Sequence, residues 1–165
     1  MWRAWLAGDG HRVTGHAQGG DPRQVSIPCR DGLILGAHIW PAAGTDPGHG
    51  SALGGVIINP ATGVLARYYH RYARFLTSEG FDVLTYDYRG IGLSRPDDMR
   101  TSRYRWREWG EQDCDAALRF LRERSEGPLM VVGHSIGGFL PGMAQSAPMI
   151  HRMLTMGAQY AWWGD

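Results

Sequence analysis

Apolar and polar residues alternate between Gln24 and Trp40. The apolar positions are Val25, Ile27 and Cys29, followed by Leu33, Leu35, Ala37 and Ile39. An Asp-Gly pair at residues 31–32 separates the two stretches, and this pair is typical of the tight turn between antiparallel strands. The pattern predicts a β-hairpin with one buried face.

Beyond this segment the alternation gives way to continuous apolar runs. The four runs read GVIINP, FDVLTYDYRG, PLMVVG and RMLTMGA. The length and the β-branched residues of GVIINP are those of a buried strand in a parallel sheet, and PLMVVG is also interpreted as a buried strand. We therefore expect four parallel strands after the hairpin.

Segments with helical spacing separate the four runs. The first ends at Gly80, a residue type that often follows the last turn of a helix, and its apolar stripe is interpreted as packing on the sheet: Tyr68, Tyr72, Phe75 and Leu76. The second is expected to run from about Trp106 to Arg124, with three inward side chains: Ala117, Phe120 and Leu121. The third, within GGFLPGMAQSA, carries a proline.

The alternation of strands and helices predicts the α/β class, with a mostly parallel sheet, right-handed crossovers and an antiparallel hairpin at one edge. Residues 24–165 are expected to form this domain. Residues 1–23 are rich in Gly, His, Arg and Asp without periodicity, and they are interpreted as a loose leader. Functional residues of such sheets lie at the carboxyl ends of the strands.

Composition and charge narrow the choice of partners. The 165 residues have a formal net charge of +1, so no nucleic-acid partner is expected. No segment approaches the roughly 18 apolar residues of a membrane span. The two cysteines lie far apart, which suggests neither a disulfide framework nor a zinc site and fits a cytoplasmic location. We expect no metal and no cofactor.

The stretch GHSIG matches the G-x-S-x-G pattern between a predicted strand and a predicted helix. Such a turn lifts the hydroxyl of Ser135 above the sheet, and the flanking glycines let the neighbouring backbone approach it. The N–H of Ile136 can then stabilise an oxyanion. His134, the other neighbour of the serine, is expected to pack against the adjoining loop. Ser135 is the predicted nucleophile.

The second oxyanion donor is expected from the loop NPATGV, which follows the first parallel strand. Pro60 has no N–H, so the N–H of Ala61 is the predicted donor, with that of Thr62 in reserve. Asp87 and Arg89 follow the second parallel strand and therefore lie on the same face. We expect Asp87 to accept hydrogen bonds from its own Gly90–Gly92 loop and to shape a wall of the site.

The chain resembles the α/β-hydrolase superfamily in INPATGV, in YYHRYARFLTSEGFDVLTYDYRGIGLSRP, in WGEQD and in VVGHSIGG. Within it, these segments are similar to predicted hydrolases of the serine aminopeptidase and monoacylglycerol lipase-like branch. The resemblance covers about Val25 to Tyr160. It implies a serine hydrolase acting on a small-molecule ester, amide or related acyl bond. It also implies two further strands that would carry the partners of Ser135, so the fold is expected to be truncated after about the sixth strand.

Serine hydrolases of this fold carry the acid and then the histidine after the nucleophile. After Ser135 the chain offers His151 and Asp165 in the reverse order. The predicted third helix carries the chain back along the sheet, so His151 is expected at the end of the fourth strand opposite Ser135.

Three hypotheses follow from this incomplete set of catalytic residues. The first is a serine hydrolase that is weakly active or inactive as given. The second is a catalytically dead fold that binds a partner. In the third, a second chain completes the site. The aromatic tail GAQYAWWGD is expected to be exposed and to favour self-association.

Overall fold

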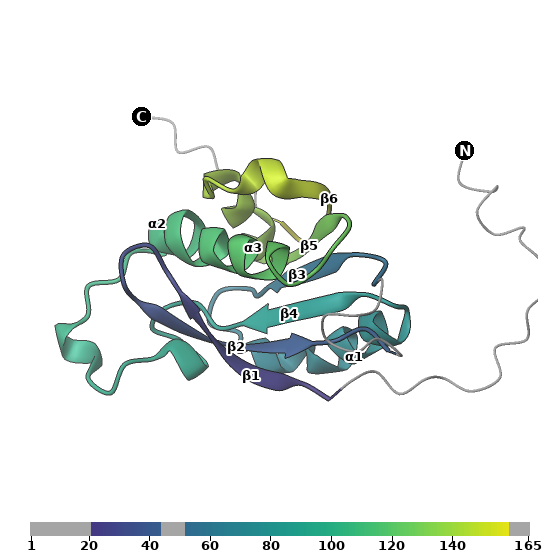
Figure 1. Ribbon diagram of the computed structural model, residues 1–165. Coiled ribbons are helices and arrows are strands. Elements are labelled where there is room, and N and C mark those ends of the chain that lie inside the picture. The colour runs from purple at the N-terminus through teal and green to yellow at the C-terminus, as the bar shows by residue number, and fades with distance from the viewer. Residues whose placement is uncertain (1–20, 44–51, 159–165) are drawn as a thin grey trace, which may run out of the picture.

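The hairpin predicted from the alternating pattern forms one edge of a six-stranded sheet. The computed structural model describes residues 21–43 and 52–158. Its strands lie in the order β1-β2-β4-β3-β5-β6 across the sheet (Figure 1). Their bounds are β1 (Arg23–Pro28), β2 (Ile34–Trp40), β3 (Gly55–Asn59), β4 (Asp82–Tyr86), β5 (Leu129–His134) and β6 (Ile150–Met156).

Strand directions follow the prediction. β1 pairs with β2 and β2 pairs with β4 in antiparallel fashion, whereas β3, β4, β5 and β6 are parallel. The predicted mostly parallel sheet with an antiparallel edge hairpin is therefore confirmed. Because the four parallel strands share a direction, the loops that follow β3, β4 and β5 meet at one edge of the sheet. The first twenty residues of the expected leader and the aromatic tail from residue 159 lie outside the described residues.

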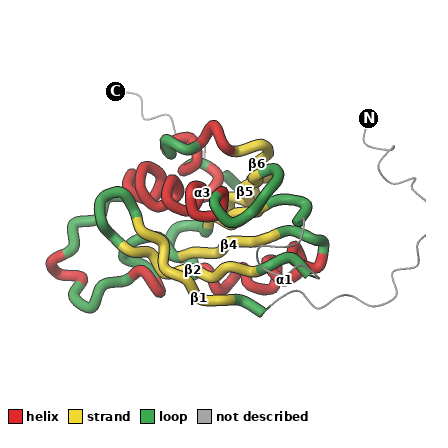
Figure 2. The backbone as a smooth tube through the Cα atoms, viewed as in Figure 1, coloured by secondary structure: helices red, strands yellow, loops and turns green. Residues whose placement is uncertain are grey.

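Helices cover both faces of the sheet (Figures 1 and 2). α1 (His70–Ser78) lies on one face, and α2 (Trp106–Glu108) and α3 (Asp115–Arg122) lie on the other. A π-helical turn, Trp109–Cys114, joins α2 to α3. Short 3₁₀ turns are Ala66–Tyr69, Gly92–Ser94, Met99–Thr101, Ser135–Gly138, Leu140–Met143 and Ala147–Met149. The predicted second helix is thus present from Trp106 to Arg122, with one widened turn.

The burial of β3 explains its continuous apolar run. All five of its residues are buried. Ile57 packs in the cluster that contains Leu118 and Leu121 of α3, whereas Val56 and Ile58 pack in the cluster on the α1 side. Successive side chains of a strand point to opposite faces, so a strand that is covered on both faces has no polar positions.

The predicted aromatic stripe on the first helix is wrong at two positions. Tyr68 is 74% exposed and Phe75 is 53% exposed, while Ala73 and Thr77 are fully buried. The helix approaches the sheet through small side chains, which lets its backbone lie close to the strands. Large residues at helical spacing therefore identified the helix but not its buried face.

The predicted helix after Ser135 is also wrong, because three 3₁₀ turns replace it. Pro141 and Pro148 stand at the start of the second and third turns and have no N–H to donate within a continuous helix. Three glycines in this segment further lower its helix propensity. The chain still reaches β6 at the end of the sheet opposite Ser135.

β6 is the other edge of the sheet, and six of its seven residues are exposed. Met153, Leu154 and Met156 are 48%, 53% and 41% exposed. Among the described residues, no segment covers the outer side of this strand. An apolar edge strand of this kind is an unusual surface for a folded domain.

Candidate active site

Ser135 follows β5 directly and begins the 3₁₀ turn Ser135–Gly138. Its φ of +53° is the one positive value for a non-glycine residue in the described part of the chain. This left-handed conformation is costly for a residue with a Cβ, and it persists only where the surroundings enforce it. The turn is therefore sharp and strained at the predicted nucleophile.

Two glycines beside Ser135 are required by close backbone contacts. A Cβ at Gly137 would collide with the carbonyl oxygen of Asn59 and would lie 2.7 Å from that of Pro60. A Cβ at Gly133 would collide with the backbone of Gly138. The loop after β3 therefore lies directly against the turn after β5, with no room for a side chain between them.

Asn59 fastens this contact with its side chain. Its Nδ2 donates to the carbonyl oxygen of Gly137 at 3.1 Å and to the sulfur of Cys114 at 3.5 Å. Its Oδ1 accepts a hydrogen bond of 2.8 Å from the Tyr86 hydroxyl. Asn59 was not singled out from the sequence, although a polar residue that ends an otherwise apolar strand is a signal for such a role.

The two predicted oxyanion donors differ in their surroundings. Ile136 is the second residue of its 3₁₀ turn, where an N–H has no acceptor within the turn. The N–H of Ala61 already donates to the hydroxyl of Tyr69, at 3.1 Å. The N–H of Thr62 has no acceptor among residues 21–43 and 52–158.

His134 lies beside Tyr69. The Nδ1 of His134 is 2.8 Å from the Tyr69 hydroxyl, and the two rings meet edge to face with centroids 6.1 Å apart. Tyr69 ends the 3₁₀ turn that leads into α1, so one phenol contacts both the loop after β3 and the residue before Ser135. Sequence reasoning missed Tyr69, because this contact joins segments that lie far apart in the chain.

Asp87 follows β4, and both oxygens of its buried carboxylate accept backbone hydrogen bonds. Oδ1 accepts from the N–H of Ala66 at 2.7 Å, and Oδ2 accepts from that of Leu93 at 2.9 Å. The Ser94 hydroxyl donates to the backbone carbonyl of Asp87 at 2.6 Å. The donor from its own loop is thus Leu93, the residue after Gly92, and a second donor comes from the turn that carries Tyr69.

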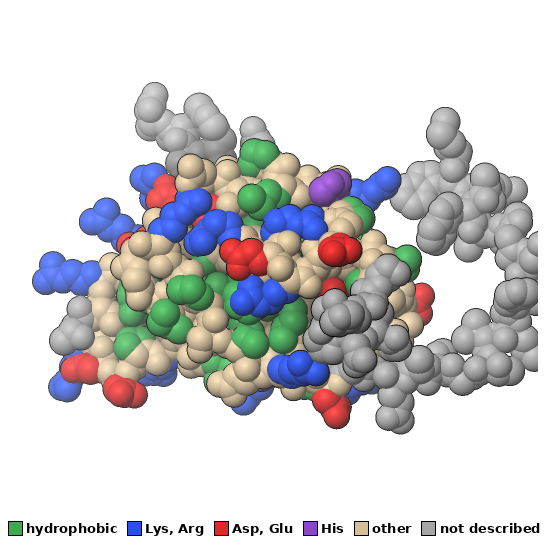
Figure 3. Space-filling model, viewed as in Figure 1, with side chains coloured by type: hydrophobic (Ala, Val, Ile, Leu, Met, Phe, Trp, Pro, Cys, Tyr) green, Lys and Arg blue, Asp and Glu red, His purple; other side chains and the backbone are tan. Residues whose placement is uncertain are grey.

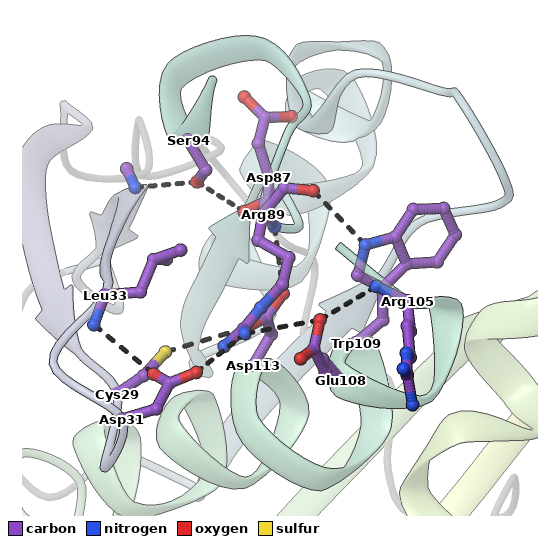
Figure 4. A network of polar contacts seen from close by, with 11 residues as sticks. Cys29, Asp31, Leu33, Asp87, Arg89, Ser94, Arg105, Glu108, Trp109 and Asp113 are labelled. Carbon is purple, nitrogen blue, oxygen red and sulfur yellow. Dashed lines mark hydrogen bonds and ion pairs between the residues drawn. The ribbon is translucent and has the colours of Figure 1, made fainter. Parts of the chain in front are cut away.

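Arg89 is buried and lies at the centre of a group of carboxylates, of which Asp113 is buried as well (Figure 4). Its Nε donates to Asp113 at 2.8 Å, its Nη1 donates to Asp31 at 2.7 Å, and Glu108 lies 3.7 Å away. The backbone N–H of Arg89 also donates to Asp113, at 2.9 Å. The guanidinium is 2% exposed and is engaged with carboxylates of this chain. It therefore ties the hairpin turn and the π-helical turn to the end of β4.

Burial shifts the titration of two groups in this cluster. It raises the pKa of the Asp113 carboxyl to about 6, although the charge and hydrogen bonds of Arg89 oppose the shift. It raises the pKa of the Cys29 thiol to about 12, with a further contribution from Asp113. Cys29 is therefore a neutral thiol near pH 7, and its Sγ lies 3.6 Å from Asp113 as a weak donor.

The hydroxyl of Ser135, the predicted nucleophile, forms no hydrogen bond with a histidine or carboxylate among residues 21–43 and 52–158. His151 accepts from the N–H of Leu129, at 3.2 Å, and Leu129 is the first residue of β5. The histidine thus lies at the end of β5 opposite Ser135.

Binding of a metal ion or insertion into a membrane would require particular side chains or helices in residues 21–43 and 52–158. No group of three or more His, Cys, Asp or Glu side chains in this part of the chain could hold a metal ion. None of the helices in that part of the chain has the length and apolar character needed to cross a bilayer. On the face shown in Figure 3, arginine side chains lie among carboxylates, and surface ion pairs include Arg107 with Glu111 at 2.6 Å.

Known structures share this fold. A hypothetical protein from Pseudomonas aeruginosa matches with a TM-score of 0.66 and 22% identity, over 84% of this chain and 43% of that one. An α/β serine hydrolase without a lid from Xanthomonas campestris matches with a TM-score of 0.64 and 16% identity, over 87% of this chain and 64% of that one. An esterase from Pyrococcus furiosus matches with a TM-score of 0.55 and 23% identity, over 73% of this chain and 45% of that one. The chain thus spans less than two thirds of each of these structures.

The strand order and these likenesses define an α/β-hydrolase fold. A family model described as serine aminopeptidase, S33, matches residues 51–155, which is more than half of the 165 residues. The chain belongs to this family of hydrolases. No curated protein sequence matches it.

The contact between Gly137 and the loop after β3 predicts a large cost for any side chain at this position. Gly137→Ala should lower the free energy of unfolding by about 1–3 kcal/mol, because backbone atoms would have to move to admit the methyl group. Gly142→Ala is the matched control, since no atom lies within 4 Å of a Cβ there. Urea unfolding measures both variants. Equal midpoints for the two would contradict the contact.

The raised pKa of Asp113 predicts a pH-dependent stability. Its folded-state pKa of about 6 exceeds the ordinary value of 3.8, so the folded chain binds more protons than the unfolded chain between these values. The contribution of Asp113 to the free energy of unfolding is therefore largest below pH 4 and decreases as the pH rises to about 6. An asparagine at this position would not titrate.

We expect the free energy of unfolding of the wild-type chain, minus that of Asp113→Asn, to decrease from pH 4 to pH 7. The decrease should be at most about 3 kcal/mol, since one pKa unit corresponds to about 1.4 kcal/mol. Urea titrations at pH 4, 5, 6 and 7 give this difference. A difference that stays constant or increases with pH would show that Arg89 lowers the pKa of Asp113 by at least as much as burial raises it.

Proposed function

We propose that this chain is part of a serine hydrolase that cleaves small-molecule esters or amides through an acyl-enzyme on Ser135. The strained φ of Ser135, on a turn at the carboxyl edge of the sheet, is the observation that carries the proposal. Strain of this kind is stored where a side chain must be held in one direction. Membership of a serine aminopeptidase family and the likeness to a Pyrococcus furiosus esterase support it.

The proposed reaction begins when Ser135 Oγ attacks the carbonyl carbon of the substrate and gives up its proton to a base. The carbonyl oxygen becomes an oxyanion, which the N–H of Ile136 and a second N–H from the loop after β3 would stabilise. Collapse of this intermediate expels the protonated alcohol or amine and leaves an acyl-enzyme. Water then attacks the acyl carbon, releases the acid and restores the serine hydroxyl.

The rate of this reaction depends on the base that accepts the serine proton. Without one, Ser135 is an ordinary alcohol, and the residual rate comes from oxyanion stabilisation and binding. We therefore propose that the 165-residue chain alone is weakly active or inactive. A cytoplasmic location is proposed with it, since both Cys29 and Cys114 are buried free thiols.

The second candidate function is a binding module without catalysis. The apolar, exposed edge strand β6 favours it, because such an edge can pair with another chain or a copy of this one. In this case Ser135 would be a structural residue of the turn. The two candidates differ in the reactivity expected of its hydroxyl.

A fluorophosphonate probe distinguishes the two functions. We expect slow labelling of the wild-type chain at Ser135, over hours rather than seconds, because no base is held against the hydroxyl. Ser135→Ala should abolish the labelling, whereas Ser102→Ala, a change at a serine next to a surface 3₁₀ turn, should leave it unchanged. Mass spectrometry of the labelled peptide identifies the site.

Two results would count against the proposal. Labelling that survives in Ser135→Ala, or that is absent at high probe concentration, would remove the nucleophile and favour the binding module. Labelling within seconds would show that a base does accept the proton of Ser135.

A further inference from the structure

The hydroxyl of Tyr69 joins the two halves of the proposed oxyanion site. It accepts the N–H of Ala61 at 3.1 Å, on the loop after β3. It also lies 2.8 Å from Nδ1 of His134, on the residue before Ser135. Tyr69 and Ala61 are both buried. In the described part of the chain, this is the one side-chain hydroxyl that contacts both segments.

The chemistry of a phenol allows both bonds at once. Its oxygen has two acceptor positions and one proton. The Ala61 N–H occupies one acceptor position, and the phenol and Nδ1 of His134 share one proton between them. The two hydrogen bonds therefore do not compete, and they hold Ala61 and His134 at a fixed separation. When the phenol donates its proton to Nδ1, each of the two hydrogen bonds also strengthens the other.

A hydrogen bond to Tyr69 directs the Ala61 N–H toward the phenol. One N–H makes one well-aligned hydrogen bond, and an oxyanion donor must point at the oxyanion from about 2.7–3.1 Å. The adjacent Thr62 N–H is the next donor along the same loop and has no acceptor among residues 21–43 and 52–158. Of these two N–H groups, only that of Thr62 is therefore without an acceptor in the described part of the chain.

Tyr69 is itself held in place from β4. The Asp87 carboxylate accepts the N–H of Ala66, the first residue of the 3₁₀ turn that ends at Tyr69. The same carboxylate accepts the N–H of Leu93 from the loop after β4. Asp87 therefore fixes the start of the turn, and Tyr69 transmits this constraint to both sides of the proposed oxyanion site.

We infer that Tyr69 is a positioning residue of the site at Ser135, which ties the loop after β3 to the turn at Ser135 and leaves the Thr62 N–H as the second oxyanion donor. This inference rests on the proposed function only for the identity of the ligand. The fixing of the loop by Tyr69 is a separate claim that can be tested without any reaction.

The first experiment measures the 165-residue chain, before any reaction with the probe, by ¹⁵N NMR. Tyr69→Phe should shift the Ala61 amide and the His134 Nδ1 resonance and should accelerate amide hydrogen exchange at Ala61 about tenfold, which corresponds to the loss of one buried hydrogen bond. Tyr88→Phe is the matched control, because its hydroxyl is buried and donates to the Pro60 carbonyl of the same loop at 3.2 Å. It should shift the Ala61 amide as well, because the Pro60 carbonyl belongs to the same peptide group, but it should leave the amide exchange rate of Ala61 and the His134 Nδ1 resonance unchanged.

The second experiment measures the rate of fluorophosphonate labelling. Tyr69→Phe should label about ten times more slowly than Tyr88→Phe, because a tenfold change in rate corresponds to the loss of one hydrogen bond. In the labelled wild-type chain the amides of Ile136 and Thr62 should shift downfield while that of Ala61 stays in place. Faster labelling of Tyr69→Phe would overturn the inference, since it would show that the phenol competes with the oxyanion for Ala61. Equal rates would overturn it as well.

The two experiments separate this inference from the proposed function. If labelling does not depend on Ser135, the proposed function fails, and the NMR comparison still decides whether Tyr69 holds the loop. If labelling depends on Ser135 but the amide exchange rate of Ala61 and the His134 Nδ1 resonance are the same in both phenylalanine variants, the positioning role fails and the proposed function stands.

Discussion

The backbone of Asn59 and Pro60 lies so close to Gly137 that no side chain fits between them. This contact forces the loop after β3 and the turn after β5 into one unit, which the Asn59 side chain then bonds to β4 and to the start of α3. The position of Ser135 and of the two proposed oxyanion donors depends on this contact. The proposed site is thus built first from backbone packing and only then from reactive side chains.

A second constraint comes from the buried charge of Arg89. Arg89 could not stay buried alone, since an unpaired charge in the interior costs several kcal/mol. Asp113 reaches it because the helix widens by a π-helical turn at Trp109–Cys114, and such turns frequently occur at functional sites. Asp31 brings the hairpin turn to the same cation. One guanidinium therefore fixes three segments that the sequence separates by many residues.

Much of this architecture could be predicted from the sequence because it depends on local periodicity. The residues of the hairpin alternate because one face of it is covered. The runs in β3, β4 and β5 are continuously apolar because both faces of these strands are covered. The helix predicted after Ser135 does not form, because Pro141 and Pro148 have no N–H to donate in a continuous helix. The prediction gave too little weight to proline.

Within the candidate site, a local motif was enough to select Ser135 and Ile136. The contacts of Asn59 and Tyr69 were not predictable in this way. Asn59 meets Gly137 across 78 positions, and Tyr69 meets His134 across 65 positions, so no window along the chain contains either pair. Such contacts exist only once the strands have been ordered.

The left-handed backbone at Ser135 has a consequence for the evolution of this segment. Glycine would adopt the same conformation without the steric cost, which is of the order of 1–3 kcal/mol for other residues. A domain shaped by folding alone would gain from glycine at this position. A serine at this position therefore makes the fold less stable than a glycine would, and in return it supplies a hydroxyl group at the edge of the sheet.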